Sequence, residues 1–148
     1  MLLAFFKGDK KMIYERKVNY YETDSMKIVH HSNYIRYMEE SRTYALAKVG
    51  LPYSKMEEGG ILIPVLAVNC VYKHPARYED IILVDVKVKE YTGVKIIMEY
   101  EITNKETGEL ILTGESKHCF TDVNLKPVSL KKARPDMHEM MIKLENAG

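Results

Sequence analysis

The strongest constraint on the fold is the stretch 81–91, which alternates between apolar and charged side chains. Its valines occupy every second position, and acidic or basic residues stand between them. A period of two places the valines on one face of a β-strand and the charges on the other. The same alternation returns over 96–102, and Thr92-Gly93 between the two runs predicts a tight hairpin turn. The middle of the chain is therefore expected to form an antiparallel sheet with one buried face.

A different period marks the segment from Asn33 to Val49, where apolar residues recur at the spacing of an α-helix. Ser32 or Asn33 is the expected N-cap, and Gly50 closes the helix. Further strands are expected over 12–21, 61–73 and 110–122, with 61–73 buried on both sides, and a short helix over 135–144. One long helix against five mostly antiparallel strands predicts an α+β domain.

Composition narrows the class of protein further. The 148 residues are 46% hydrophobic and 29% charged, and 22 basic against 21 acidic side chains leave a net charge of +1. This balance argues against a nucleic-acid partner held by phosphate contacts. No apolar run approaches the roughly 20 residues that cross a bilayer, and the opening residues lack the features of a signal peptide. We expect residues 1–12 to be an N-terminal extension, 13–148 to be a single domain, and the location to be cytoplasmic.

The residues that can carry chemistry are concentrated between the first strand and the long helix, in residues 20–34. This segment holds a carboxylate, Asp24, two imidazoles, His30 and His31, and the start of a helix. Free N–H groups at a helix start can hold an oxyanion, and a carboxylate beside them can attack a carbonyl or activate water. The plainer alternative is that Asp24 caps a turn and the histidines are loop residues. A metal site is not expected, because adjacent histidines on an extended segment point in opposite directions.

The pattern Tyr20-x-x-x-Asp24, with His31 and Tyr34 following at fixed spacing, resembles the 4-hydroxybenzoyl-CoA thioesterase family and most closely its YbgC-like branch. The run Glu40-Ser41-Arg42 extends the resemblance. It implies a hotdog fold, in which a five-stranded antiparallel sheet wraps around one long central helix. It also implies hydrolysis of an acyl-CoA without metal or redox cofactor, by a homo-oligomer in which two subunits build the active sites and dimers commonly form tetramers.

The resemblance assigns roles to individual residues. Asp24 matches the essential aspartate, either as a nucleophile or as a general base, and the resemblance does not choose between them. Tyr20 and His31 match positions around the reacting thioester, so they are expected to be catalytic with Asp24. Backbone N–H groups from His31 to Tyr34 would polarise the thioester carbonyl, which places Asn33 and Tyr34 in the substrate site. The sequence departs from many relatives at 25–27, where Ser-Met-Lys replaces small residues and changes the expected acyl pocket.

Other candidates rest partly on the residues and partly on the resemblance. Lys73 and Arg77 lie in a basic turn that could hold the phosphates of CoA, although a solvated turn is equally expected. Glu39 and Glu40 are alternative catalytic carboxylates, with Glu39 also placed to pair with Arg42 one helical turn away. A hotdog dehydratase or hydratase and a non-catalytic acyl-CoA-binding protein stay as alternative functions.

Overall fold

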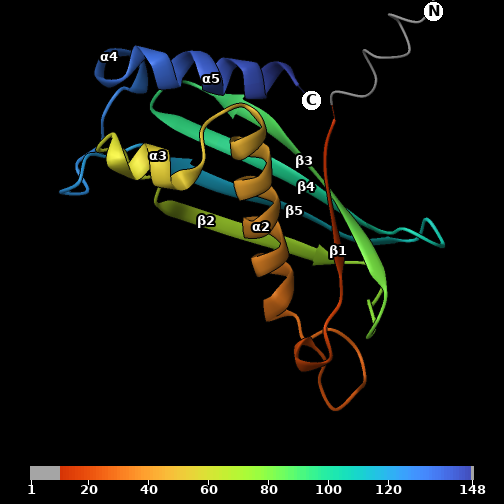
Figure 1. The fold of residues 1–148 in the computed structure, drawn as a ribbon. Helices are drawn as coiled ribbons and strands as arrows, with labels where there is room; N and C mark the ends of the chain where they lie inside the picture. Colours follow the sequence, from red (N-terminus) through yellow and green to blue (C-terminus); the bar gives the residue numbers. More distant parts are fainter. Residues whose placement is uncertain (1–10, 148) are drawn as a thin grey trace, which may run out of the picture.

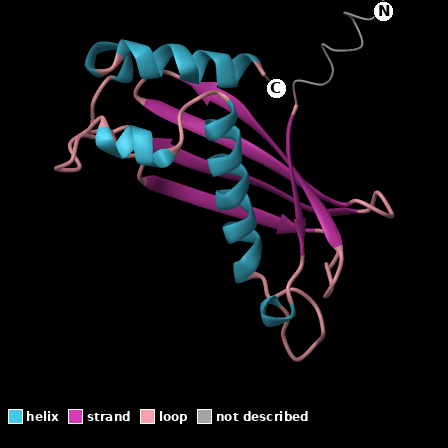
Figure 2. Cartoon of the chain, in the orientation of Figure 1, coloured by secondary structure: helices cyan, strands magenta, loops and turns pink. Residues whose placement is uncertain are grey.

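A computed structural model describes residues 11–147, whose centre is a five-stranded antiparallel sheet with strand order β1-β3-β4-β5-β2 (Figure 1). The helices gather on one face of this sheet (Figure 2). The strands are β1 (Met12–Lys17), β2 (Val65–Tyr72), β3 (Ile81–Tyr91), β4 (Lys95–Asn104) and β5 (Leu110–Cys119). The helices are a 3-10 turn η2 (Tyr20–Glu22), α2 (Ser32–Lys48), α3 (Tyr53–Glu58), α4 (Leu130–Ala133) and α5 (Pro135–Asn146). The sequence therefore predicted the five-stranded antiparallel sheet correctly.

The predicted extension, residues 1–12, lies outside the described residues except for its last two. Met12 already belongs to β1, where it pairs with Val86 of β3. Within residues 11–147, every helix is too short or too polar to cross a lipid bilayer.

As predicted from the alternation of 81–91, the valines of this strand lie on one buried face. Val84 and Val86 are completely or almost completely buried, and they pair across the hairpin with Ile102 and Tyr100 of β4. Gly93 adopts a left-handed conformation (φ 86°) at the hairpin turn, which a residue with a side chain would adopt only at a cost. The central strands thus present one continuous apolar face to the helices.

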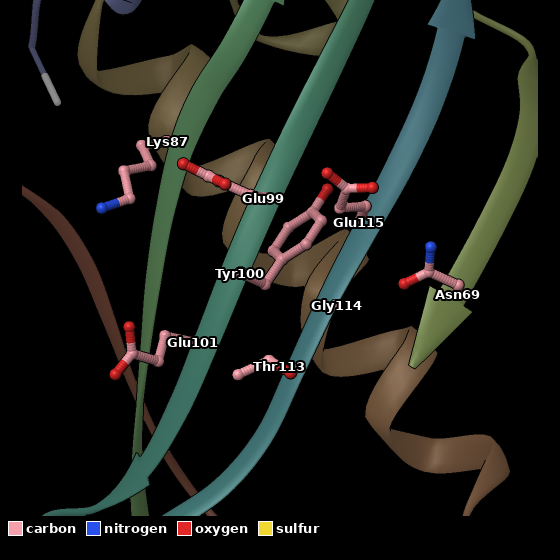
Figure 3. A pocket seen from close by; sticks show the side chains of 8 residues that line it. All are labelled: Asn69, Lys87, Glu99, Tyr100, Glu101, Thr113, Gly114 and Glu115. Carbon is pink, nitrogen blue, oxygen red and sulfur yellow. The ribbon is translucent and has the colours of Figure 1, made fainter. Parts of the chain in front are cut away.

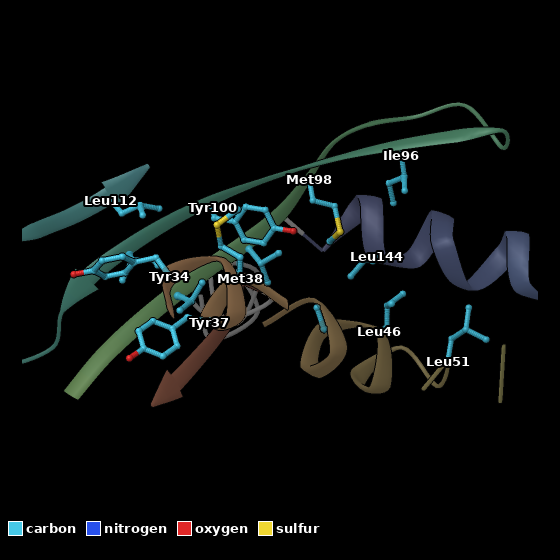
Figure 4. Close-up of a cluster of buried hydrophobic side chains, with 14 of the residues drawn as sticks. Tyr34, Tyr37, Met38, Leu46, Leu51, Ile96, Met98, Tyr100, Leu112 and Leu144 are labelled. Atoms are coloured by element: carbon cyan, nitrogen blue, oxygen red, sulfur yellow. The ribbon is translucent and has the colours of Figure 1, made fainter. Parts of the chain in front are cut away.

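The 17-residue helix α2 lies against that face and begins one residue earlier than the expected caps, since His31 takes the N-cap position. Its side chains interlock with those of the sheet and of α5, as Figure 4 shows for the cluster of Tyr34, Tyr37, Met38, Leu46, Leu51, Ile96, Met98, Tyr100, Leu112 and Leu144. The C-terminal helix α5 adds Met137, Met141 and Leu144 to the same core. Two helices therefore share the apolar face, with α2 the longer of them.

The second strand differs from the sequence prediction. The expected strand at 61–73, buried on both sides, is shorter, and among residues 11–147 β2 is an edge strand that pairs with β5 alone. Its side chains at Val65, Leu66, Val71 and Tyr72 are each about half exposed. An apolar run signals burial without saying whether the same chain or another molecule buries it, so the sequence could not separate the two. The α3 helix was not predicted, and β1 ends at Lys17 instead of residue 21.

A chain of polar side chains crosses the core between α2 and the sheet. The guanidinium of Arg42 donates to the Tyr100 hydroxyl over 3.1 Å, Tyr100 contacts the Ser116 hydroxyl at 2.6 Å, and Ser116 contacts His118 Nε2 at 2.7 Å. All four residues are at least 95% buried. Burial, with a contribution from the nearby Arg42 charge, lowers the pKa of His118 to about 4. His118 is therefore neutral in the folded protein near pH 7.

This network predicts a loss of stability in weak acid. His118 takes up a proton below about pH 6.5 in the unfolded chain but only near pH 4 in the folded one, so its contribution is complete above pH 6.5 and is lost as the pH falls toward 4. Between pH 7 and pH 5 the loss is about 2 kcal/mol of unfolding free energy. Urea unfolding at both pH values should show this loss in the wild type, and the His118→Gln variant should lack it. An equal pH dependence in both proteins would contradict the assignment.

Candidate active site

Glu22, whose side chain is buried, joins the loop that carries Asp24 to β1 and to α2. The Glu22 carboxylate accepts hydrogen bonds from the Arg16 guanidinium (2.5 Å) and from the backbone N–H of Asn19 (2.7 Å). Its backbone carbonyl accepts the N–H of His30 and the side-chain amide of Asn33, both at 2.9 Å. One residue thus joins β1, the loop and the first turn of α2.

Asp24 opens a tight turn on this loop. Its carbonyl accepts the N–H of Lys27, and its N–H donates to Ile28, both over 2.9 Å. The backbone of Lys27 is left-handed (φ 66°), an uncommon conformation for lysine. The Asp24 Oδ1 accepts the Met26 N–H at 2.8 Å. Among the described residues Oδ2 has no hydrogen-bond partner, so one carboxylate oxygen is oriented by the turn and the other is available for chemistry.

A cavity of about 300 Å³ lies beside this carboxylate. Its walls come from three parts of the chain: the Asp24 loop, the start of α2, and the segment that ends β2. The lining residues are Asp24, Met26, Ile28, Val29, His31, Tyr34, Tyr72, Lys73, His74 and Pro75. The walls are mostly apolar, with one carboxylate and several basic groups, as expected of a site for an organic ligand with a charged part.

The first turn of α2 borders the same cavity. Within the part of the chain that the structure describes, the side chain of the N-cap residue, His31, makes no capping hydrogen bond. The Ser32 N–H reaches His30 Nδ1 at 3.3 Å, and the Asn33 N–H bonds to the His30 carbonyl at 2.9 Å. The open end of a helix carries a partial positive charge, which stabilises a negative charge close to it. The cavity therefore joins a carboxylate oxygen to an electropositive helix end.

The structure brings some predicted site residues together and leaves others apart. Asp24, His31, Tyr34 and Lys73 line the cavity. The Tyr34 hydroxyl, however, accepts the backbone N–H of Ala76, so this side chain fixes the wall of the cavity. The imidazole of His31 is exposed beside His30, with ring centroids 4.2 Å apart. These contacts leave His31 free to approach a ligand.

Three other candidates lie away from the cavity. Tyr20 is 75% exposed, and its ring packs edge-on against Tyr78, so its catalytic role stays a prediction. The side chain of Asn33 is buried on Glu22 and supports the loop, while the Arg77 backbone N–H bonds to Asp80 in an exposed turn. The proposed contacts of Asn33 and Arg77 with substrate likewise stay predictions.

The two helix glutamates are now distinguishable. Glu40 accepts hydrogen bonds from Tyr14 (2.9 Å) and Arg16 (2.7 Å), which commits its carboxylate to the fold. Glu39 is exposed and borders a separate groove. The predicted Glu39–Arg42 ion pair is wrong, because Arg42 turns inward to Tyr100.

Tyr72 is a polar cavity-lining residue that the sequence did not indicate. It lies at the end of β2, donates from its hydroxyl to the His31 carbonyl at 3.3 Å, and packs against Tyr34 with ring centroids 5.6 Å apart. Nothing in the apolar run of β2 singled it out, because its position depends on how β2 returns beside the start of α2.

A second cavity, of about 270 Å³, lies on the sheet across the four strands β3, β4, β5 and β2 (Figure 3). Glu99 and Glu115 stand opposite each other in the pairing of β4 with β5, and Glu101 lies nearby. A group of carboxylates repels the phosphates of CoA, and this cavity lacks a helix end. The cavity beside Asp24 is therefore the better candidate for catalysis. Within residues 11–147, no group of three or more His, Cys, Asp or Glu side chains is placed to hold a metal ion.

Comparisons with known proteins show what most of the chain is similar to. A model of the thioesterase-like superfamily matches residues 18–142. The Bacillus subtilis protein YneP, named as a proposed acyl-CoA thioesterase, is 40% identical over 125 residues, which cover 84% of this chain and 90% of YneP. The Escherichia coli acyl-CoA thioester hydrolase YbgC is 23% identical over 117 residues, covering 79% of this chain and 87% of YbgC. The crystal structure of a DHNA-CoA thioesterase from Staphylococcus aureus superposes with a TM-score of 0.86 at 34% identity, covering 91% of each chain.

The fastening of the loop leads to a prediction about Asn33. Replacing Asn33 by Ala removes a buried hydrogen bond between α2 and the loop, and we expect a loss of about 1–3 kcal/mol of unfolding free energy. Chemical denaturation measures this loss. Asn124→Ala, in an exposed loop, is the control and should change stability little. An Asn33→Ala protein as stable as the wild type would show that the amide does not hold the loop.

Proposed function

The chain belongs to the thioesterase-like superfamily, and on this premise we propose that it hydrolyses an acyl-CoA to a carboxylic acid and free CoA with Asp24 as the reacting carboxylate. The observation that carries the proposal is the cavity in which a free oxygen of Asp24 and the open end of α2 border the same space. An acyl transfer needs both parts, a group that supplies an electron pair and a donor for the oxyanion.

The reaction follows from this arrangement. The thioester carbonyl lies against the start of α2, where the N–H groups that are not bonded to His30 and the helix dipole stabilise the negative charge that develops on its oxygen. Asp24 Oδ2 either attacks the carbonyl carbon or takes a proton from a water that attacks it. In both routes the carbon–sulfur bond breaks and the thiolate of CoA leaves. In the first route water then cleaves the mixed anhydride and restores the carboxylate.

The remaining residues assist binding. His31 and Tyr72 form one side of the entrance, and the free amino group of Lys73 is placed to meet a phosphate of CoA, with Arg77 on the following turn. Tyr20 orients the Asp24 carboxylate, and Asn33 holds the loop that carries Asp24 through the Glu22 carbonyl. The chemistry requires no metal or redox cofactor, since the carboxylate and the helix end supply both functions.

The active protein is proposed to be a homodimer formed through β2. This strand has one unpaired edge and exposed apolar side chains, which are features of a surface that another molecule covers. Antiparallel pairing of two β2 edges joins two sheets into one and is satisfied by a two-fold axis. In this assembly α2 is the central helix of a hotdog fold. Association of dimers into a tetramer and a cytoplasmic location remain predictions.

The direct test is release of thiol from short, medium, long and aromatic acyl-CoAs, followed with a chromogenic disulfide. Asp24→Asn keeps the side chain's size but removes its charge and nucleophilicity, so we expect turnover to fall by at least about a hundredfold. Asp122→Asn, whose carboxylate only closes an exposed turn, is the control and should keep wild-type turnover.

Two results would argue against this role of Asp24. Full activity of Asp24→Asn would move the role to Glu39, whose carboxylate is exposed, and not to Glu40, which is committed to Arg16. No thiol release from any acyl-CoA by the wild type would favour a dehydratase or a binding protein.

The dimer has its own test. Leu66→Lys places a charge on the exposed side of β2, where it does not disturb the core but must be desolvated in a β2–β2 interface. We expect the variant to sediment as a monomer in analytical ultracentrifugation and to lose most of its turnover. Val123→Lys, at another exposed position, should stay associated. An associated Leu66→Lys protein would place the interface elsewhere.

A further inference from the structure

Within residues 11–147, three buried side-chain atoms have no hydrogen-bond partner: the Tyr37 hydroxyl, Arg42 Nε and His118 Nδ1. The last two lie at the ends of one hydrogen-bond chain. The exposed fractions of Arg42 and His118 are 5% and 1%. Unpaired buried polar atoms are costly and uncommon in folded proteins, so a pair of them calls for an explanation.

The hydrogen-bond chain determines what both atoms require. Arg42 is a donor only, so it donates a hydrogen bond to the Tyr100 oxygen. The Tyr100–Ser116 contact allows either direction, and we assign Tyr100 as its donor. With this assignment the Ser116 hydroxyl donates to Nε2 of His118. The imidazole is neutral because burial and Arg42 lower its pKa to about 4. A neutral imidazole that accepts at Nε2 carries its proton on Nδ1. Both unpartnered atoms are therefore donors that require an oxygen.

The two residues face a common space that is open at one end. Both line a cavity of about 10 Å³, enough for one oxygen atom. Arg42, Tyr53 and Ile63 also line an adjoining groove of about 130 Å³, and an apolar cavity of about 150 Å³ accommodates benzene. The groove walls add Met56, Ile61, Leu62 and Val65, with Glu39 and Glu57 as charged members. These walls suit a short apolar group with an uncharged oxygen at its far end, since the two carboxylates outnumber the one guanidinium, Arg42, and give the groove a net negative charge.

The groove ends beside the start of β2, whereas the Asp24 cavity borders its other end at Tyr72. Within one subunit the groove and the Asp24 cavity therefore lie at opposite ends of β2. Antiparallel pairing of two β2 edges about a two-fold axis places the Val65 end of one strand beside the Tyr72 end of the other. The groove of one subunit then continues the Asp24 cavity of its partner.

We infer that the acyl group extends from Asp24 of one subunit into the groove of its partner, where Arg42 and His118 donate hydrogen bonds to a neutral oxygen at its far end. This inference rests on the proposed function and makes the substrate an oxygen-bearing short acyl-CoA. A site built to hydrogen-bond an oxygen discriminates strongly against the analogue that lacks it, because its donors are then left buried and unpaired.

The test compares thiol release from butyryl-, hexanoyl- and octanoyl-CoA with release from their terminal-hydroxy counterparts. For at least one pair, the wild type should prefer the hydroxylated substrate by about tenfold or more in kcat/KM. His118→Leu and Arg42→Met remove one donor each, and both should bring this ratio close to one. His138→Leu, which replaces a histidine bonded to Tyr91 on α5, is the control and should keep the wild-type ratio. A wild-type ratio near one for all pairs, or an unchanged ratio in both donor variants, overturns the inference.

A spectroscopic readout covers variants that fail to fold. Nitrogen-15 NMR of histidine-labelled wild type should show His118 protonated at Nδ1, with a shift of that signal when a hydroxylated acyl-CoA is added to the Asp24→Asn protein. A proton on Nε2, or a signal unchanged by saturating ligand, contradicts the donor assignment. Failure of the proposed function is recognised separately, because the wild type then releases no thiol from either member of any pair.

Discussion

The position of Asp24 beside α2 depends on the contacts of one buried residue, Glu22. Its carboxylate neutralises Arg16, which also reaches Glu40 on α2, and its carbonyl receives the amide of Asn33. The residue is 3% exposed, so its charge is stable only because these partners surround it. Through them β1, the Asp24 loop and the start of α2 form one rigid unit. The distance between the carboxylate and the helix end is thereby set by the fold and not by the substrate.

Much of this arrangement could be predicted from local sequence. The alternation of 81–91 predicted both ends of β3 correctly, and the helical period predicted each end of α2 to within one residue. Asp24 and His31 were chosen as candidates because they precede a recognisable helix start at the spacing of the family motif, and both line one cavity in the structure. Signals of this kind lie in a few consecutive residues, where periodicity and capping act.

The parts that could not be predicted depend on contacts between distant residues. The exposure of β2 follows from its place at the sheet edge, which its apolar run does not reveal. Tyr72 reaches the site only because β2 returns beside the first turn of α2. The chain from Arg42 to His118 requires the pairing of β4 with β5, which sets Tyr100 near Ser116. From the sequence Arg42 was expected to pair with Glu39 on the helix surface, and nothing marked His118, whose pKa is lowered by its burial.

The central claim is that the thioester lies between Asp24 and the open end of α2. It is tested most directly by a crystal structure of the protein with an acyl-CoA analogue in which a non-hydrolysable ketone replaces the thioester. The account predicts that the ketone carbon lies in contact with Asp24 Oδ2 and that its oxygen faces the N–H groups of the first turn of α2. An analogue seated in the acidic cavity across β3, β4, β5 and β2, or with its carbonyl away from Asp24, would contradict it.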